Sequence, residues 1–390
     1  MLRIGEFTDT FYPIVDGVGR VVYNYALQIC QKGHECYVVA PMTDTGYLGG
    51  KPYELIEFVS VDLPMQRQYQ TGIPLSDAHY LRKIQQVNLD IIHVHSPFIA
   101  GTEALRLAKK RKIPVIGEFH SKYYDDFYQY TKAAMLANLG VKMIVDFYSR
   151  CDEVWTVSNS SAETLYDYGF KGDIVVIPNG TPDVNLDTDR REAAKKLFNL
   201  TGEKPILMYC GQMNWKKNIL RILESLALLK QKGYDFDFVM VGQGLDAKAI
   251  QSKAEELGLM ENMVFTGHIH EDAIINGLYE AADLFIFPSL YDTSGLVVRE
   301  AAALATPSVV VRGSAPAEII EDKENGLLCE DTTESLASVI QKVFDNPELS
   351  RLLGENAKST IFLPWSKVID MSLNRYQMLI EKKKQTYSSD

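Results

Sequence analysis

The chain has few cysteines, and no two of them have the spacing of a metal or redox motif. The five cysteines are odd in number and scattered along 390 residues, at Cys30, Cys36, Cys151, Cys210 and Cys329. This pattern argues against a disulfide framework and against a cysteine zinc site. It is typical of reduced thiols, so we expect a cytoplasmic protein.

Long apolar runs are also absent. No uncharged apolar run approaches the roughly 18 residues that a membrane-spanning helix needs. The N-terminal stretch MLRIGEFTD lacks the apolar core of a signal peptide and is typical of a first strand. We therefore expect no membrane span, and at most a peripheral attachment to the inner face of the membrane.

Positive charge is in deficit as well. The 40 Lys and Arg residues stand against 51 Asp and Glu residues, which gives a formal net charge of −11 at pH 7. Such a chain has no global basic field that would gather phosphates, so we expect no nucleic-acid partner. Local basic clusters are not excluded by this balance.

The sequence does contain a regular alternation of short apolar runs and helical patterns, over a length that usually needs two cores. Runs such as IIHVH, VIGEF and LFIF do not alternate apolar with polar residues, which indicates strands buried on both faces of a parallel sheet. The expected strands are Leu2–Phe7, Glu35–Ala40, Leu55–Val59, Asp90–His95, Val115–Phe119, Glu153–Val157, Ile174–Ile177, Pro205–Cys210, Phe236–Val241, Val264–Thr266, Leu284–Pro288, Ser308–Val311 and Gly326–Cys329.

The two halves of the chain begin alike, which predicts two similar domains. In each half a strand, a glycine-bearing loop, a helix and a second strand fill about 35 residues, the size of a βαβ unit. We predict an α/β fold with two doubly wound Rossmann-like domains, 1–185 and 186–365, and a helix over 366–390 that packs back toward the N-terminal domain. The join falls in the polar stretch Asp183–Glu203, whose pattern is also compatible with a helix. Ligands of such sheets bind at the carboxyl ends of the strands, so the expected site is a cleft between the two domains.

Two loops of the N-terminal half carry candidate site residues. Gly17 and Gly19, in the loop TDTFYPIVDGVGR, would let backbone N–H groups approach an anion. A flexible turn is an equal alternative, because the third glycine of a dinucleotide fingerprint is missing. His120 follows the strand VIGEF at the functional edge of the sheet, with a structural role as the alternative. His93 and His95 are interpreted as structural, because no nearby cysteine or carboxylate spacing completes a metal site.

The loops of the C-terminal half carry glycines and lysines. The loop GQMNWKKN places Gly211 at a strand end and Lys216 and Lys217 shortly before a helix, and the loop VGQGLD adds Gly242 on the same rim. A diphosphate needs cations and N–H donors, which these lysines and the helix start would supply. A solvated lysine pair is the alternative. The acid pairs DTD, in the linker, and DFD, at a strand start, are accidental by their positions, so no metal ligands are expected.

Two carboxylates lie in the stretch PSLYDTSGLVVREAAA, directly after the buried run LFIF. Asp292 precedes a helix whose first turn is expected to include Ser294, Gly295 and Leu296, and Glu300 follows eight positions after Asp292. N–H groups of that turn would cap a phosphate, while Asp292 reaches a sugar hydroxyl and Glu300 a different part of the ligand. The alternative is an ordinary helix N-cap and a surface glutamate. The glycines and lysines on the same rim favour the ligand site.

With these motifs the chain resembles the retaining GT-B glycosyltransferases of the large family that includes sucrose synthases, bacterial mannosyltransferases and diacylglycerol glucosyltransferases. The resemblance runs over nearly the whole chain. It is strongest in PSLYDTSGLVVREAAALATPSVVV, which is similar to the family's segment with two glutamates separated by seven residues. GQMNWKKN is similar to the family's Gly-Arg…Lys-Asn phosphate loop, and ENGLLC to its Asn-Gly-Leu-Leu.

The resemblance implies transfer of a hexose from a nucleoside diphosphate sugar. We expect the hexose to be glucose and the donor to be UDP-glucose. The resemblance also implies retention of the anomeric configuration and no metal or other cofactor. Asp292, His120 and Lys217 are then the catalytic residues: Lys217 binds the diphosphate, Asp292 holds the sugar, and His120 meets the sugar from the other side of the cleft. The departing phosphate itself takes the proton of the acceptor. The donor-binding residues implied are Gly17, Gly19, Gly211, Gln212, Lys216, Lys217, Gly242, Ser294, Gly295, Leu296 and Glu300.

The chain departs from the family pattern at two of these positions. Asp292 replaces the usual first glutamate, and Gln212 stands where the family usually has an arginine that neutralises the diphosphate. The loss of one cation weakens stabilisation of the leaving group. A catalytically weakened sugar-nucleotide-binding protein is therefore the alternative from another class. A non-hydrolysing epimerase is disfavoured, because only His120 is well placed for that chemistry.

The acceptor is expected to be diacylglycerol or another membrane lipid. The segments FTDTFYPIVDGV and EFHSKYYDDFYQY are most similar to diacylglycerol glucosyltransferases. A soluble or cell-surface polysaccharide is the alternative acceptor. The segment RLAKKRK would hold an anionic membrane surface at about 1 kcal/mol per charge, with a solvated helix end as its alternative. The cations of this segment are Arg106, Lys109, Lys110, Arg111 and Lys112.

Overall fold

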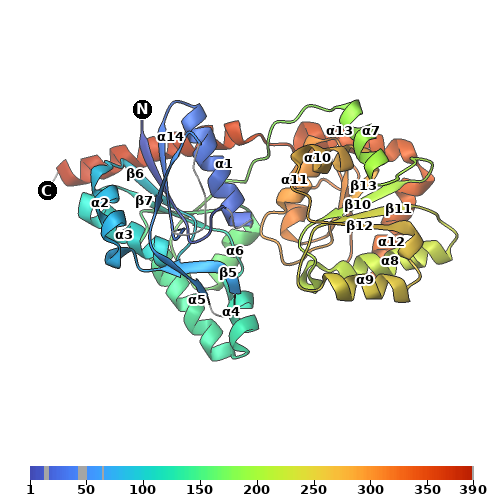
Figure 1. Ribbon diagram of the computed structural model, residues 1–390, viewed down its shortest axis with the longest axis horizontal. Coiled ribbons are helices and arrows are strands. Elements are labelled where there is room, and N and C mark those ends of the chain that lie inside the picture. The colour runs from blue at the N-terminus through green and yellow to red at the C-terminus, as the bar shows by residue number, and fades with distance from the viewer. Residues whose placement is uncertain (13–16, 43–50, 64–65, 389–390) are drawn as a thin grey trace. The chain divides into compact units, whose positions relative to one another are not determined.

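The computed structural model describes the chain except for residues 13–16, 43–50, 64–65 and 389–390. The chain divides into two compact units (Figure 1). The first unit is Met1–Asn179 together with Trp365–Asp390, and the second is Gly180–Pro364. Each unit contains a parallel sheet with its own helices, which confirms the predicted α/β class.

The first unit contains a seven-stranded parallel sheet in the order β3-β2-β1-β6-β7-β8-β9. The chain builds the sheet outward from β1 on both sides, so the strand order reverses between β1 and β6. Ligands of doubly wound sheets bind at the carboxyl end of such a reversal. The elements are β1 (Arg3–Phe7), α1 (Gly17–Gln31), β2 (Glu35–Ala40), β3 (Glu54–Glu57), β4 (Ser60–Leu63), β5 (Gln66–Gly72), α2 (Ala78–Gln86), β6 (Ile91–Val94), α3 (Ile99–Arg111), β7 (Val115–Phe119), α4 (Tyr123–Thr131), α5 (Ala134–Ser149), β8 (Glu153–Thr156), α6 (Asn159–Asp167), β9 (Ile174–Val176) and α14 (Trp365–Ser388).

The second unit repeats this plan with a six-stranded parallel sheet in the order β12-β11-β10-β13-β14-β15. Its strand order reverses between β10 and β13, which are hydrogen-bonded neighbours. The loops that follow these two strands therefore emerge side by side. The elements are α7 (Thr188–Leu197), β10 (Ile206–Cys210), α8 (Ile219–Gln231), β11 (Asp237–Val241), α9 (Ala247–Glu256), β12 (Met263–Gly267), α10 (Asp272–Ala281), β13 (Leu284–Ile286), α11 (Leu296–Ala303), β14 (Ser308–Val311), β15 (Leu327–Cys329), α12 (Thr333–Asp345) and α13 (Pro347–Thr360).

The predicted strands are all present, and each begins and ends within two residues of its expected bounds. In β6, β7 and β14 every residue is buried. Burial on both faces explains why their sequences do not alternate apolar with polar residues. The antiparallel pair β4 and β5 is an addition that the sequence pattern does not predict, because the strand QRQYQTG is polar and has no apolar face to signal it.

Helix α1 begins earlier than the sequence pattern predicts. Gly17 and Gly19, expected in the loop after β1, lie in the first turn of α1. Gly17 is exposed and Gly19 is buried. Residues 13–16 of the same loop lie outside the described residues. Any approach of this segment to a phosphate would therefore come from the N-terminus of a helix and not from a glycine loop.

Helix α14 carries the chain back into the first unit. Its Arg375 forms an ion pair with Glu153 of β8 at 2.7 Å, and its Asp370 forms one with Lys32 at 2.6 Å. Tyr376, on the same helix, is fully buried. The first unit is thus built from two stretches that are far apart in the sequence.

Candidate active site

The loop between β13 and α11 holds Asp292, and α11 itself carries Glu300. Gly295 is the N-cap of α11 and has left-handed backbone angles, with φ 59° and ψ 51°. A Cβ at this position would lie 2.8 Å from Cγ of Pro316, so glycine is required here on two counts. The helix therefore begins at Leu296. Ser294 and Gly295, expected inside the first turn, lie just before it, and only Leu296 belongs to the turn.

The structure brings Asp292 against the lysine loop that follows β10. Lys217 Nζ lies 2.7 Å from Asp292 Oδ1, and the two side chains are only 14% and 21% exposed. The ammonium groups of Lys216 and Lys217 lie 4.7 Å and 5.3 Å from the ring centre of Tyr291. The neighbouring strands β10 and β13 place these two loops together, so Asp292 is more than a simple helix cap.

One oxygen of Asp292 is left for another partner. Asp292 Oδ2 is buried and has no hydrogen-bond partner among the described residues. A buried carboxylate oxygen without a donor is costly, so such an atom fits a ligand that supplies a hydroxyl. Asp292 thus has one oxygen on Lys217 and one oxygen available to a sugar hydroxyl.

Glu300 has different surroundings. It lies on α11, half-buried, and its Oε2 accepts a hydrogen bond from the hydroxyl of Tyr279 on α10 at 3.4 Å. Asp292 is held by a cation, whereas Glu300 receives a neutral donor. The two carboxylates are therefore suited to different parts of a ligand.

The glycines of the neighbouring loops are required by packing as well as by any ligand. Gly242 has a φ of 135°, and a Cβ there would lie 1.9 Å from the carbonyl oxygen of Gly211. The amide of Gly211 donates to the carbonyl of Val241 at 3.0 Å. Gln212, next in the chain, is exposed, and its carbonyl accepts a hydrogen bond from the hydroxyl of Tyr209 at 3.0 Å. The loops after β10 and β11 thus pack backbone against backbone.

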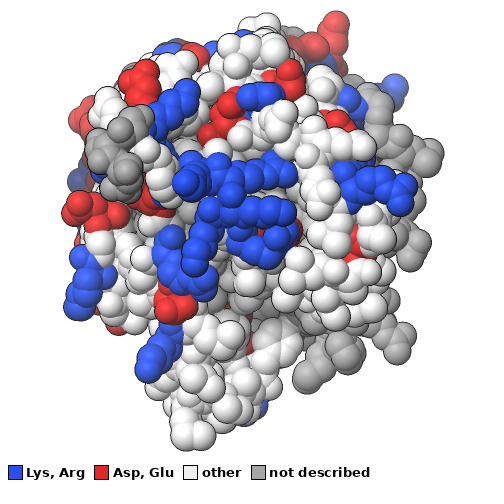
Figure 2. All heavy atoms as spheres, turned by 90° about the vertical axis from the view of Figure 1, so that its left-hand side faces the viewer, with Lys and Arg blue, Asp and Glu red and all other residues white. Residues whose placement is uncertain are grey.

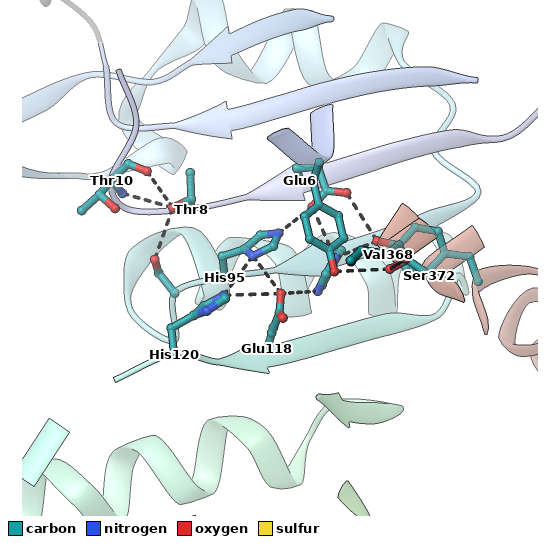
Figure 3. A network of polar contacts seen from close by, with 12 residues as sticks. Glu6, Thr8, Thr10, His95, Glu118, His120, Val368 and Ser372 are labelled. Atoms are coloured by element: carbon teal, nitrogen blue, oxygen red, sulfur yellow. Dashed lines mark hydrogen bonds and ion pairs between the residues drawn. The ribbon is translucent and has the colours of Figure 1, made fainter. Parts of the chain in front are cut away.

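His120, the candidate from the first unit, directly follows β7 and is 7% exposed. It belongs to a buried polar cluster (Figure 3). Its Nε2 lies 3.1 Å from Nδ1 of His95 and 3.4 Å from Oε2 of Glu118. His93 also reaches Oε2 of Glu118, at 3.3 Å. The sequence spacing around His93 and His95 does not reveal their carboxylate neighbours, because the neighbouring strands supply Glu118 and also Glu6.

The sequence does carry a signal for these missed carboxylates. Glu6 and Glu118 lie inside RIGEF and VIGEF, runs that are expected to be buried on both faces. An ionisable residue inside such a strand needs a buried partner. His93 and His95 are the polar residues of a third run of this kind, IIHVH. Once the strand order is known, these histidines are the predicted buried partners of the two glutamates.

A second missed feature is the surface of α5. Met135, Leu139 and Met143 recur every four residues along this helix and are 79%, 57% and 68% exposed. Figure 1 shows α4 and α5 extending away from the sheet of the first unit. An apolar repeat at helical spacing is ordinarily read as a core-facing stripe, which is why the sequence pattern alone does not identify an exposed face.

Comparison with known proteins identifies the family. The family description "Glycosyl transferases group 1" matches residues 190–360, and "Glycosyltransferase Family 4" matches residues 15–184. The GDP-mannose-dependent alpha-mannosyltransferase of Corynebacterium glutamicum is 26% identical over 388 residues, which cover 97% of this chain and 89% of the relative. The alpha-monoglucosyldiacylglycerol synthase of Streptococcus pneumoniae is 27% identical over 359 residues, which cover 90% of this chain and 80% of the relative.

Solved structures agree on the fold. Sucrose-phosphate synthase from Thermosynechococcus elongatus matches with a TM-score of 0.80 and 19% identity, over 98% of this chain and all of the other chain. The chain belongs to the GT-B glycosyltransferase family, in agreement with the resemblance seen in its motifs. Its class is that of glycosyltransferases.

Proposed function

We propose that the protein is a retaining transferase that moves glucose from UDP-glucose to a hydroxyl of a membrane lipid such as diacylglycerol. The name of the Streptococcus pneumoniae relative supports a glucosyl donor and a lipid acceptor. The name of the Corynebacterium glutamicum relative makes GDP-mannose the competing donor. The observation that carries the lipid acceptor is the exposed apolar face of α5.

The donor would be held by the loops of the second unit. Lys217 and Lys216 supply positive charge for the diphosphate, and the N-terminus of α11 adds the positive end of a helix dipole. Asp292 Oδ2 accepts a hydrogen bond from a sugar hydroxyl, and Glu300 binds the ribose hydroxyls. These groups meet the charge of the diphosphate without a metal ion, so we propose metal-independent binding.

Transfer would then depend on electrostatic stabilisation of the leaving diphosphate. Negative charge grows on the phosphate oxygens as the glycosidic bond breaks, and Lys217 is fixed in place by Asp292 before that happens. The departing phosphate takes the proton of the acceptor hydroxyl, so no enzymic nucleophile is needed. Gln212 does not supply the charge of the arginine that it replaces, which leaves the neutralising role to the two lysines.

The acceptor side is proposed to lie against a membrane through α5. Side chains at positions 135, 139 and 143 share one helix face, and Lys132 and Lys142 stand beside it in the sequence. Apolar side chains next to lysines are typical of helices that lie in a lipid interface. Among the described helices, none combines the length and the hydropathy needed to cross a bilayer. Peripheral attachment is therefore the proposed mode.

The basic cluster at the end of α3 would add electrostatic attraction to anionic lipids. Figure 2 shows Lys and Arg side chains gathered on one face of the molecule. Three of the five cations already have partners: Arg106 binds Glu103 at 2.6 Å, Arg111 donates to the carbonyl of Val87 at 2.6 Å, and Nζ of Lys112 lies 5.2 Å from the ring centre of Tyr387. Lys109, Lys110 and Lys112 are exposed, so they are the members of the cluster that a membrane would meet. The sequence alone suggests that the five cations are equivalent, but the structure shows that they are not.

The test is a donor and acceptor screen with product detection by mass spectrometry, run with UDP-glucose and GDP-mannose on vesicles that contain diacylglycerol and on soluble glycans. Glucosylated lipid from UDP-glucose supports the proposal. Transfer from GDP-mannose alone, or to soluble glycans alone, overturns the donor or the acceptor. Binding of UDP without consumption of any donor indicates the catalytically weakened binding protein that Gln212 suggests.

Vesicle co-sedimentation tests the membrane face directly. Replacing Leu139 and Met143 by Ser should reduce binding to vesicles, because the apolar area that enters the interface is lost. Leu245→Ser is the matched control, since Leu245 is 92% exposed but lies in the second unit. Equal loss in both variants would indicate a nonspecific effect of surface polarity and would argue against α5 as the attachment site.

A further inference from the structure

The core of the first unit contains a chain of buried polar side chains that ends at His120. Glu6, His93, His95 and Glu118 are each fully buried, on the neighbouring strands β1, β6 and β7 or just beyond their ends. Glu6 pairs in register with His93. Residues two apart in a strand point to the same side, so His95 lies beside His93, and His120 beside Glu118. Figure 3 shows the cluster between the sheet and α14.

His95 is the centre of this cluster. Its Nε2 donates to Oε2 of Glu6 at 2.7 Å, and its Nδ1 lies 3.1 Å from both Oε2 of Glu118 and Nε2 of His120. The rings of His95 and His120 stack at 5.3 Å between centres with planes 16° apart. Burial lowers the pKa of His95, but the bonds to Glu118 and Glu6 outweigh it and raise the pKa to about 9. His95 therefore places a positive charge between the two buried carboxylates at neutral pH.

Glu118 is contacted by three imidazole rings, so its position depends on these neighbours. Its Oε2 lies 3.1–3.4 Å from nitrogens of His93, His95 and His120, yet neither carboxylate oxygen makes a well-aligned hydrogen bond with any described residue. These distances are those of ion-pair contacts between a carboxylate and imidazole N–H groups. A carboxylate held by three rings shifts when one ring changes its tautomer.

The far end of the chain is Tyr376 of α14. Its hydroxyl lies 2.7 Å from Nδ1 of His93, and its ring stacks on Trp155 with planes 6° apart. The hydroxyl has one proton, and its contact with Oε1 of Glu6, at 3.5 Å, is much longer than its contact with His93. When the proton is given to Nδ1, the proton of neutral His93 lies on Nε2, the nitrogen that faces Glu118. The tyrosine thus fixes which tautomer of His93 meets the carboxylate.

We propose that Tyr376 is a positioning residue for His120, acting through His93 and Glu118. The tyrosine hydroxyl sets the tautomer of His93, His93 holds Glu118, and Glu118 together with His95 fixes the ring of His120. This inference rests on the proposed function and on the role that the family resemblance implies for His120, which is to meet the sugar of the donor. It goes beyond that function because it makes a residue of the last helix part of the catalytic apparatus.

The main test is Tyr376→Phe, which keeps the stack on Trp155 and removes only the hydroxyl. A misplaced group beside the reacting atoms costs roughly 10- to 100-fold in rate, so kcat should fall by that factor while the Kd for UDP stays within about twofold. Ser372→Ala is the matched control: Ser372 lies one turn away on the same helix and bonds to Tyr25 at 3.3 Å. The control should leave kcat unchanged.

A conservative variant separates positioning from loss of structure. His93→Gln offers an amide nitrogen near the site of Nε2 and has no tautomer to set. In the His93→Gln background, Tyr376→Phe should therefore have no further effect on kcat, a non-additivity that independent structural damage would not produce. Additive losses in the double variant, or equal losses of kcat and UDP affinity in Tyr376→Phe, would overturn the proposal.

A spectroscopic measurement keeps the inference testable without transfer activity. In protein labelled with ¹⁵N in its histidine rings, Tyr376→Phe should move the ring-nitrogen signals of His93 toward the other tautomer and should perturb those of His120. Unchanged His120 signals would refute the coupling even if the proposed transfer is correct. If the wild-type protein shows no transfer activity but Tyr376→Phe still moves the signals of both His93 and His120, the proposed function is refuted and the coupling stands. Metal analysis of the purified protein completes the test, since a stoichiometric divalent ion on His95, Glu118 and His120 would overturn a purely hydrogen-bonded chain.

Discussion

Replacing Asp292 by Asn should make the protein bind UDP more tightly and turn over its donor more slowly. In the structure Lys217 is already paired with this carboxylate at 2.7 Å, and both side chains are largely buried. A diphosphate that needs Lys217 must compete with Asp292 for it. Asn keeps the shape of the side chain and removes the charge, so the lysine becomes fully available to the phosphates.

The size of the effect follows from the strength of the pair. A hydrogen bond to a charged group contributes about 1.5–3 kcal/mol. The diphosphate recovers only part of this, because the amide oxygen of Asn still accepts a weaker bond from Lys217. We take about 1 kcal/mol as the gain, which corresponds to roughly fivefold tighter UDP binding. Turnover should fall by about 100-fold, because the carboxylate no longer stabilises the charge that develops on the sugar.

The assay is calorimetric titration with UDP and with UDP-glucose, together with turnover measured as UDP release. UDP carries no sugar, so its affinity reports the freed lysine alone, whereas UDP-glucose also loses the hydroxyl contact to Oδ2 of Asp292. In a Lys217→Met background the same Asp292→Asn change should leave UDP affinity unaltered. Weaker UDP binding by the single Asp292→Asn variant would refute the competition between carboxylate and diphosphate.

Three further predictions concern binding and stability. Glu300→Gln should weaken UDP binding by about 1.5–3 kcal/mol, the value of a charge-assisted bond to the ribose, and calorimetry would contradict this by showing unchanged affinity. Gly242→Ala should destabilise the protein by about 3 kcal/mol in thermal unfolding, because a Cβ would enter the carbonyl of Gly211, whereas Gly17→Ala, with nothing within 4 Å, should not. His95 has a folded-state pKa raised to about 9 from 6.5, so its stabilisation is complete below pH 6.5 and is lost as the pH rises through 9. Urea unfolding should show at most about 3 kcal/mol of such loss, absent in His95→Gln.

The periodicity of the sequence is sufficient to predict the two parallel sheets, because buried strands need unbroken apolar runs whatever their neighbours are. It also predicts that the loops after β10 and β13 carry the donor site, since both follow strands that end at one sheet edge. It does not predict the pairing of Lys217 with Asp292, which are 75 positions apart. That contact depends on the hydrogen bonding of β10 to β13, an order that no local pattern encodes.

The same limit explains why the buried partners of the histidines could not be named from the sequence. A search for metal or charge partners near His93 in the sequence finds none, because its partners come from β1, β7 and α14. The polar residues of this cluster share one feature: they stand inside runs in which the pattern requires apolar residues. This feature is visible in the sequence, but it does not show which residues pair with one another. The predicted start of α11 is wrong for a different reason: the left-handed backbone of Gly295 places the N-cap three residues later than Asp292.

The return of α14 to the first unit has a consequence for the order in which the chain can fold during synthesis. Every residue of the second unit, Gly180–Pro364, has been made before the ribosome reaches Trp365. The strands of the first unit are synthesised earlier, but this unit must wait for α14 before Tyr376 covers Trp155 and its hydroxyl reaches His93. We therefore expect the later half of the chain to mature first, and a nascent chain stalled near residue 364 to expose the polar core of an unfinished first unit.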